Sequence, residues 1–455
     1  MSASTAAMPA ITDWAALEPA ARRSLLRRPA QEDDAARTAA VREIVARVRA
    51  EGDAALLDYA RRFDRVELAS LGVTPAEFTA ATSRLTEVQR NAIDRAITNV
   101  RAFHAAQRGK PLVLETSPGV VCERHEVPIG AVGLYVPAGS APLPSAAVML
   151  AVPAELAGCP VRVLCTPPRP DGQADPGVLY AAARCGITQV FKAGGAQAVA
   201  AMAYGTSSIP KVDKIFGPGN AWVTAAKLLV AQDPEGAAFD LPAGPSEVLV
   251  IADDTARADF VAADLLAQAE HDPKSQVVLL TTSAVLAADV RTELERQWAR
   301  LSRREVTAQA LIASRLVVVP DLATAFAVSN DYAPEHLIVQ VTEPRRWLGL
   351  VRTAGSVFLG PWTPEPMGDY CSGTNHVLPT YGYARAYSGL SLGDFVRRMT
   401  VQEITPAGLR DLGPVARTLA ELEGLDAHAN AVTVRLDVLE SGVLPGAQSA
   451  TGSAP

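Results

Sequence analysis

From about residue 130 onward, short apolar runs alternate with alanine-rich segments of helical spacing, and this alternation constrains the fold more than any other feature. It predicts a helix at 196–204 and strands at 161–164, 189–192, 214–216, 248–251, 277–280 and 316–319. Strands that are separated by helices of this length form parallel sheets. The chain is therefore predicted to be an α/β protein.

The flanking regions have other patterns. Residues 35–108 are predicted to be helical, because apolar residues recur at i, i+3, i+4 and i+7: Val41, Ile44, Val45 and Val48, then Ile93, Ile97, Val100 and Phe103. A Tyr- and Gly-rich stretch begins near residue 380, and we expect two short helices after it. The last ten residues, 446–455, are expected to be disordered. A chain of 455 residues predicts two or three domains.

Charge and cysteine usage exclude several classes of protein. The net charge of −7 disfavours a nucleic-acid partner, which requires a basic face. No apolar run approaches the ~20 residues needed to span a bilayer, and Asp13 and Glu18 interrupt the region where a signal peptide would be apolar. We expect a cytoplasmic protein. The five cysteines include no C-x-x-C pair, so any metal would be held by nitrogen and oxygen.

Histidine is scarce, and four of the six histidines stand near carboxylates, amides, Gly or Pro in the second half: His271, His336, His376 and His428. Gln268 and His271 are spaced i, i+3 on the last predicted turn of a helix that begins near Asp253, so both face the same way. An amide oxygen and an imidazole on one turn would form half of a zinc site. The alternative is that His271 only caps the helix C-terminus.

Three further segments carry candidate chemistry, each with a plain alternative. Glu335-His336 precedes an apolar strand and suits general acid–base catalysis. Adjacent residues of a regular strand face opposite sides, so the pair shares a site only on irregular backbone, and an ordinary polar loop is the alternative. Asp369 stands in a Pro/Gly-rich loop as a possible oxygen ligand or a surface residue. Glu423 and His428 lie in a segment that a solvated helix would also explain.

The nucleotide signal is weak by the usual fingerprint, because no G-x-G-x-x-G motif follows a strand. Two strand–turn–helix junctions remain, Gly194-Gly195-Ala196-Gln197 and Gly217-Pro218-Gly219-Asn220. Backbone N–H groups and a helix N-terminus at such a junction can receive phosphate oxygens. A tight turn without any ligand is an equally good explanation of each.

Taken together and in order, the segments are far more specific than any one of them. Between Thr38 and Val443 the chain contains GLYVP, GGAQA, FGPGNAWVTAAK, PAGPSEVLVIAD, LLAQAEHDPKSQV, NDYAPEHL, MGDYCSGTNHVLPT, DFVRRMTVQEIT and EGLDAHANAV. This series resembles the histidinol dehydrogenase family over nearly the whole chain.

The resemblance implies an architecture of two incomplete Rossmann-like domains with parallel sheets, aldehyde-dehydrogenase-like, plus a helical N-terminal region and a C-terminal arm. Residues 1–30 would be an N-terminal extension, and residues 31–134 with 248–385 the first α/β domain, which carries the zinc and catalytic residues. Residues 135–247 would be an inserted NAD-binding domain. Residues 386–445 would be an arm that crosses to the partner subunit of a homodimer.

The resemblance also implies an activity, the NAD-dependent oxidation of L-histidinol through L-histidinaldehyde to L-histidine, with one zinc ion per subunit. The zinc ligands would be Gln268, His271, Asp369 and His428. His336 would be the general base, and Glu335 would activate water. Ser246, Glu423, His336 and the zinc ligands would contact the substrate. Tyr135, Gln197 and Asn220 would contact NAD.

Three other functions compete with this one. A paralogue oxidising another small alcohol, such as a sulfonated diol, is disfavoured by Glu423 and His428, which match the end of the site that binds imidazole and amine. An aldehyde dehydrogenase with a cysteine nucleophile would use Cys165 or Cys371, but neither has a sequence neighbour that would clearly activate it. A non-catalytic binding protein would not need the Glu335-His336 pair together with four ligands.

Overall fold

The computed structural model describes residues 8–29, 35–138, 142–242 and 244–442. They form two compact units. The first contains the described residues up to Arg108 together with Pro128–Phe395, and the second contains Gly109–Val127 together with the described residues from Val396 on. No helix in these ranges is both long and apolar enough to cross a membrane. The tail predicted to be disordered, 446–455, lies outside the described residues.

The first unit contains a parallel sheet of five strands in the order β6-β5-β4-β7-β8. Its strands are β4 (Ala131–Tyr135), β5 (Val161–Thr166), β6 (Gln189–Lys192), β7 (Lys214–Phe216) and β8 (Ala238–Phe239). The connecting helices are α6 (Pro144–Ala157), α7 (Pro176–Arg184), α8 (Gly195–Tyr204) and α9 (Ala221–Ala231). The strand order reverses between β4 and β7, and ligands of such sheets bind at the carboxyl ends of the strands where the order reverses.

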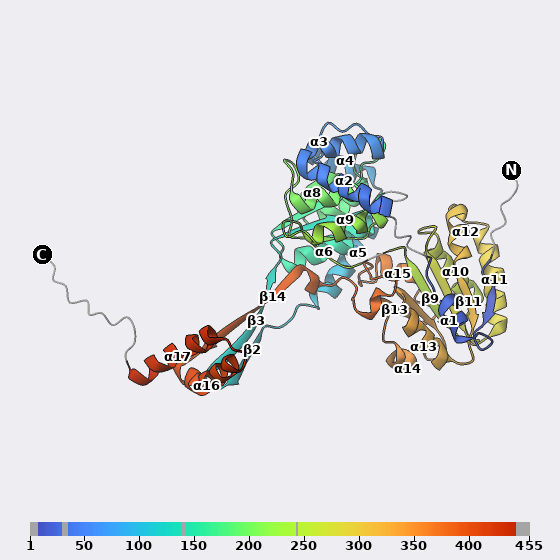
Figure 1. The fold of residues 1–455 in the computed structure, drawn as a ribbon. Helices are drawn as coiled ribbons and strands as arrows, with labels where there is room; N and C mark the ends of the chain where they lie inside the picture. The colour runs from blue at the N-terminus through green and yellow to red at the C-terminus, as the bar shows by residue number, and fades with distance from the viewer. Residues whose placement is uncertain (1–7, 30–34, 139–141, 243, 443–455) are drawn as a thin grey trace. The chain divides into compact units, whose positions relative to one another are not determined.

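Helices cover both faces of this sheet. Successive strand residues point to opposite faces, so apolar side chains emerge on both faces and are buried on both. On one face, α2 (Ala35–Glu51) and α3 (Asp53–Tyr59) share a hydrophobic core with α8 and α9 (Figure 1). On the other, α4 (Pro75–Arg84) and α5 (Glu87–Ala105) share a core with α6 and α7. The helical prediction for 35–108 is confirmed except at 65–74, which is not helical, and Phe103 is exposed rather than buried.

A second parallel sheet in the same unit has six strands in the order β1-β11-β10-β9-β12-β13. These are β1 (Ile11–Asp13), β9 (Glu247–Ala252), β10 (Gln276–Thr281), β11 (Arg315–Val318), β12 (His336–Gln340) and β13 (Ser356–Leu359). Its helices are α1 (Pro19–Leu25), α10 (Ala258–Ala269), α11 (Ala284–Trp298), α12 (Arg304–Ile312), α13 (Leu322–Tyr332) and α14 (Pro344–Trp347). All six strands predicted from the sequence are present, and the α/β class is confirmed.

The packing adds two facts to the division of the chain predicted above. Helices α2 to α5 pack on the five-stranded sheet, although the prediction groups them with residues 248–385. The N-terminal segment supplies β1, which pairs with β11 of the six-stranded sheet. The physical reason is the same for both, because each segment buries apolar side chains against the sheet that it contacts. The domain boundaries themselves stay predictions.

The second unit contains a three-stranded sheet in the order β14-β3-β2 and two helices. The strands are β2 (Leu112–Ser117), β3 (Val120–Pro128) and β14 (Val396–Ile404), and β2 and β3 are antiparallel. Helices α16 (Pro406–Leu422) and α17 (Asp426–Ser441) pack where Gly413 faces Leu436. The prediction of two short helices after residue 380 is wrong in length, since these have 17 and 16 residues.

Candidate active site

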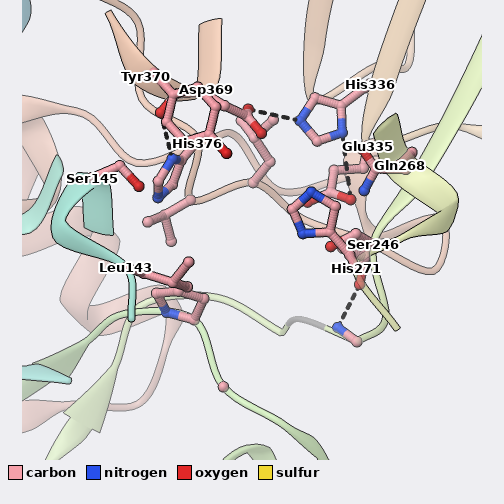
Figure 2. A pocket seen from close by; sticks show the side chains of 16 residues that line it. Leu143, Ser145, Ser246, Gln268, His271, Glu335, His336, Asp369, Tyr370 and His376 are labelled. Carbon is pink, nitrogen blue, oxygen red and sulfur yellow. Dashed lines mark hydrogen bonds and ion pairs between the residues drawn. The ribbon is translucent and has the colours of Figure 1, made fainter. Parts of the chain in front are cut away.

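A pocket of about 120 Å³ in the first unit brings together residues from both parallel sheets (Figure 2). Ser246, Glu335 and His336 come from the amino ends of β9 and β12, and Pro218 and Gly219 come from the turn after β7. In the six-stranded sheet the site therefore lies at the amino ends of the strands, whereas in the five-stranded sheet it lies at the carboxyl ends. Other lining residues are Leu143, Ser145, Gly244, Gln268, His271, Asp369, Tyr370, His376, Val377, Leu378 and Thr380.

Glu335 and His336 share the pocket because the backbone before β12 is irregular. Ala333 has a left-handed φ of 54°, and β12 begins only at His336. Glu335 therefore lies just before the regular strand. Within the strand, its side chain and that of His336 would point to opposite faces. Both side chains are buried, and Glu335 Oε2 lies 3.5 Å from His336 Nδ1 (Figure 2). The irregular backbone expected for this pair is confirmed.

The two ring nitrogens of His336 have different surroundings. Nδ1 lies 3.2 Å from the carbonyl oxygen of Glu247. A carbonyl only accepts, so Nδ1 donates its hydrogen, and the lone pair of the neutral ring is on Nε2. Nε2 is buried without a hydrogen-bond partner among the described residues, 3.5 Å from Asp369 Oδ1. In the neutral ring, this nitrogen can accept a proton from a bound molecule.

The electrostatics of the pocket are dominated by buried carboxyl groups. Burial raises the pKa of Glu335 above its usual value. Burial alone would lower the pKa of His336, but Glu365, Glu335 and Asp369 outweigh it and hold that pKa well above the usual value. A cation bound beside these carboxylates would offset their charge and bring the pKa of His336 down toward that of a usable base.

Asp369 is positioned by a short helix, α15 (Glu365–Tyr370), and not by the loop predicted from the sequence. Pro364 precedes this helix, and Pro366 falls in its first turn, where proline has no hydrogen bond to lose. The helix places Glu365 and Asp369 four residues apart, on the same side. Carboxylate oxygens of both, together with a ring nitrogen of His271, lie within 4.8 Å of one another. Sequence reasoning missed Glu365, because a loop gives no reason to pair it with Asp369.

Gln268 and His271 also meet in this pocket, although not on one helical turn. Helix α10 ends at Ala269, so Gln268 is helical, whereas His271 follows the helix and its N–H bonds the Gln268 carbonyl at 3.2 Å. His271 is exposed at the open side of the pocket, but surrounding protein atoms still displace water from the ring and lower its pKa. A lowered pKa favours the neutral imidazole that a metal requires.

The amide of Gln268 lies against the carboxylate of Glu365. A carboxylate only accepts, so the amide nitrogen takes this side and donates to both Glu365 oxygens, at 2.7 Å for Oε2. Gln268 Oε1 is then on the opposite side and is free to act as an oxygen ligand. The nitrogen and oxygen donors of Gln268, His271 and Asp369, with the Glu365 carboxylate beside them, thus suit a divalent cation such as zinc.

The predicted NAD-contacting residues lie in the five-stranded sheet and its helices. Tyr135 ends β4, and its buried hydroxyl accepts from the Gly195 N–H at 3.0 Å. Gln197 is buried in the first turn of α8. Asn220 caps α9 by accepting from the N–H groups of Trp222 and Val223. Tyr135 and Asn220 thus lie beside the carboxyl ends of β4 and β7, where the strand order reverses.

Two predicted residues belong to the second unit. Glu423 follows the last residue of α16, and His428 lies in the first turn of α17. Both are exposed. The pocket described above is formed by residues of the first unit, so the structure of this unit brings together Ser246, Gln268, His271, Glu335, His336 and Asp369 only.

His376 also lines the pocket, although no role is predicted for it beyond its place among the clustered histidines. Its Nδ1 lies 2.8 Å from the Asp369 carbonyl oxygen and therefore donates, which leaves the lone pair on Nε2. In Figure 2 the ring lies beside Asp369 and Tyr370. A hydrogen bond to α15 thus holds a second histidine in the pocket.

The candidate thiol nucleophiles are elsewhere. Cys165 is fully buried in β5, and burial raises the pKa of its thiol well above the usual value. Cys371 follows α15 but is not among the described residues that line the pocket. The geometry gives no support to a cysteine mechanism.

The chain is similar to known proteins of one family. A family described as histidinol dehydrogenase matches residues 26–436. The chain is similar to a histidinol dehydrogenase of Vibrio cholerae, with 54% identity over 427 residues, 94% of this chain and 98% of that protein. It is 57% identical to one of Xanthomonas oryzae pv. oryzae over 428 residues, 94% and 99% of the two chains.

A solved structure is similar over almost the whole chain. The crystal structure of a histidinol dehydrogenase from Elizabethkingia anophelis matches with a TM-score of 0.91 and 45% sequence identity. The match covers 95% of this chain and 99% of that one.

Proposed function

Because this chain belongs to the histidinol dehydrogenase family of NAD-dependent oxidoreductases, we propose that the pocket around Glu335 and His336 is where it oxidises L-histidinol. The reaction converts the alcohol to L-histidinaldehyde and then to L-histidine, and each step transfers one hydride to NAD. The observation that carries the assignment is the buried Glu335-His336 pair, with His336 Nε2 unpartnered among the described residues of the pocket.

In the first step, His336 Nε2 accepts the proton of the substrate hydroxyl while hydride leaves the same carbon. The hydrogen bond from Nδ1 to the Glu247 carbonyl keeps the ring in the tautomer and orientation that this transfer requires. In the second step, Glu335 takes a proton from water as the water oxygen bonds to the aldehyde carbon, and His336 returns its proton to the former carbonyl oxygen, which gives the hydrate. His336 then accepts the hydroxyl proton of the hydrate as the second hydride leaves, and the acid is formed.

We propose that a zinc ion is held by Gln268, His271, Asp369 and, from a second copy of the chain, His428. When bound, zinc would position the substrate by its imidazole and amino nitrogens. The convergence of the first three residues in one pocket supports this set. Dialysis against a chelator should abolish oxidation, and added zinc should restore it. Full activity of a verified metal-free preparation would contradict the assignment.

The remaining contacts follow from the same proposal. Ser246 is placed to contact the substrate from the start of β9, and Glu423 would do so from a second copy. NAD would bind along Tyr135, Gln197 and Asn220, where the strand order of the five-stranded sheet reverses. The turn residues Pro218 and Gly219, which line the pocket, connect this region with the catalytic pair.

We also propose a homodimer in which residues 386–445 complete the partner's site. Glu423 and His428 are exposed in the second unit, and so are several large apolar side chains of the same unit: Leu112, Val113, Leu114, Leu419 and Leu422. Apolar side chains that gather on an exposed surface are typical of a face that another protein covers. A second copy of the chain is the partner that the family resemblance implies.

The test of the activity is the stoichiometry of NADH release. Purified protein supplied with L-histidinol and NAD should form two NADH for each histidine. Release of one NADH with accumulation of the aldehyde would contradict the two-step assignment. Turnover of a different small alcohol, with none of L-histidinol, would point to the paralogous activity.

A further inference from the structure

One residue, Glu247, contacts both members of the catalytic pair through its main chain. Its N–H donates to Glu335 Oε2 at 2.8 Å, and its carbonyl accepts from His336 Nδ1 at 3.2 Å. These contacts follow from the sheet register, because Glu247 begins β9, and β12, which begins at His336, pairs with β9 in parallel. A movement of the Glu247 backbone would therefore displace both catalytic side chains together.

The side chain of Glu247 points away from the pair into a buried polar network. It is 2% exposed, and its carboxylate accepts hydrogen bonds from three residues. The Tyr332 hydroxyl donates to Oε2 at 2.8 Å, and the Tyr381 N–H donates to Oε1 at 2.7 Å. Arg28 donates from Nε to Oε2 at 2.6 Å and from Nη2 to Oε1 at 3.1 Å. The carboxylate is thus held at both oxygens.

Arg28 comes from the N-terminal segment and holds the second catalytic strand as well. Its Nη2 donates to the carbonyl oxygens of Tyr332, at 2.7 Å, and of Ala333, at 3.3 Å. Its guanidinium also lies over the Tyr332 ring, 3.9 Å from the centroid. Ala333 is the left-handed residue that leads into Glu335. One guanidinium therefore joins the start of β9 to the turn before β12.

We propose that Arg28 and Glu247 are positioning residues for the oxidation, which hold Glu335 and His336 in register through the Glu247 main chain. The proposal rests on the roles assigned above to Glu335 and His336. It gives the N-terminal segment a function in catalysis, since Arg28 lies about 220 residues before its ion-pair partner in the sequence. Misplacement of catalytic groups by about 1 Å can cost roughly a hundredfold in rate.

The experiment compares Arg28→Met, Glu247→Gln and the double variant in the zinc-loaded enzyme. Each single variant should lower kcat about 10- to 100-fold for histidinol and for histidinaldehyde supplied directly. The KM for NAD should stay within about twofold, because the network does not reach Tyr135, Gln197 or Asn220. The double variant should be more active than Arg28→Met, since it no longer buries an uncompensated carboxylate. Arg28→Lys should restore part of kcat, because it keeps the charge but not the two-pronged geometry.

Val290→Ala is the control for lost stability. Val290 is fully buried in α11, in a hydrophobic core that does not contain Arg28, Glu247 or Tyr332. The Val290→Ala variant should have a lower Tm than the wild type but the same kcat. The proposal is overturned if folded Arg28→Met and Glu247→Gln keep kcat within about twofold of the wild-type value. It is also overturned if their kcat falls no further than that of Val290→Ala when Tm falls by the same amount.

Glu335→Gln and His336→Asn, measured alongside, separate the two proposals. If those variants keep the wild-type kcat, the proposed function fails and this inference fails with it. If they lose activity while Arg28→Met and Glu247→Gln do not, only the positioning role is wrong.

Discussion

At the scale of single residues, the chemistry depends on how the two nitrogens of His336 are distinguished. A main-chain carbonyl accepts from Nδ1, whereas Nε2 faces the pocket beside Asp369. Glu335 receives an N–H from the same residue that holds Nδ1. In the proposed mechanism the two groups thus have a common support but different tasks, since His336 acts in both oxidation steps and Glu335 only in the second.

Substitution of each catalytic residue should therefore affect the two steps differently. Glu335→Gln should slow aldehyde oxidation most, by about 10²- to 10⁴-fold, because the amide cannot take a proton from water. His336→Asn should slow both steps. Single-turnover measurements with histidinol, and separately with histidinaldehyde, check this. Unimpaired aldehyde oxidation by Glu335→Gln would contradict the assignment.

Glu365 is the residue whose role is least visible in the sequence. It accepts from the Gln268 amide nitrogen, and this contact turns the amide oxygen the other way. Glu365→Gln should weaken zinc binding by about 10- to 100-fold. The substituted side chain at position 365 has neither the negative charge nor the two accepting oxygens that orient the Gln268 amide. Competition of the purified variant with a chromophoric chelator measures the affinity without reference to activity.

Glu295→Gln is the matched control for the Glu365 variant. It removes the same charge from an exposed position on α11. Its zinc affinity should equal that of the wild type. Equal affinities for the Glu365 and Glu295 variants would show that Glu365 has no part in the metal site.

At the scale of elements, the turn between β7 and α9 is rigid for identifiable reasons. The Gly217 N–H donates to Asp240 Oδ2 at 2.7 Å, and Lys227 Nζ donates to the Gly217 carbonyl and to Asp240 Oδ1. Both charged side chains are buried. Gly217 has a φ of 123°, which favours glycine, and a Cβ there would collide with the Tyr135 carbonyl oxygen. The turn is thus held against the carboxyl end of β4.

Gly217→Ala should disturb this turn and, with it, the binding of NAD. We expect the KM for NAD to rise about tenfold or more, with little change in the KM for histidinol, because strain of roughly 1–3 kcal/mol would move Pro218 and Gly219. Steady-state kinetics with each substrate varied in turn provide the measurement. Gly349→Ala is the control, since a Cβ there meets nothing within 4 Å. An unchanged KM for NAD in folded Gly217→Ala would refute the role of the turn.

The elements also show what the sequence could and could not predict. The buried strands were found because each is a short apolar run bounded by turn residues, as at 189–192. The sequence predicts a loop where α15 forms, since prolines and Gly368 conceal a helix whose first turn tolerates proline. The sequence does not predict β14, because its polar and apolar residues do not alternate regularly and nearly all of them are exposed. The sequence itself marks Gln268-x-x-His271, Glu335-His336 and Asp369 as candidates, but their assembly into one site is implied only by the family resemblance, since contacts between distant residues are not visible in local patterns.

At the scale of the whole molecule, the proposed exchange of arms predicts complementation between inactive variants. Glu335→Gln and His428→Ala homodimers should each be nearly inactive. In a mixed dimer one site contains both substitutions. The other site contains an unchanged Glu335 from one chain and an unchanged His428 from the other. Unfolding and refolding the two variants together should restore up to about a quarter of wild-type activity, since half of the random dimers are mixed.

The control is the same mixture without unfolding, in which the chains do not exchange and activity should stay low. Formation of mixed dimers can be verified with two different affinity tags. If mixed dimers form and no activity returns, each arm serves its own subunit, and the proposed dimer is wrong.

The pairing of β1 with β11 has a consequence for synthesis of the chain in the cell. Ile11 is matched with Leu316, about 300 residues later. At a translation rate of roughly 5–20 residues per second, the first strand waits about 15–60 s for its partner. Until then the edge of β1 is open, and contacts of such long sequence separation form slowly. β1 thus leaves the ribosome long before β11 and pairs late, and a prematurely terminated chain that lacks β11 would present β1 as a site for aggregation.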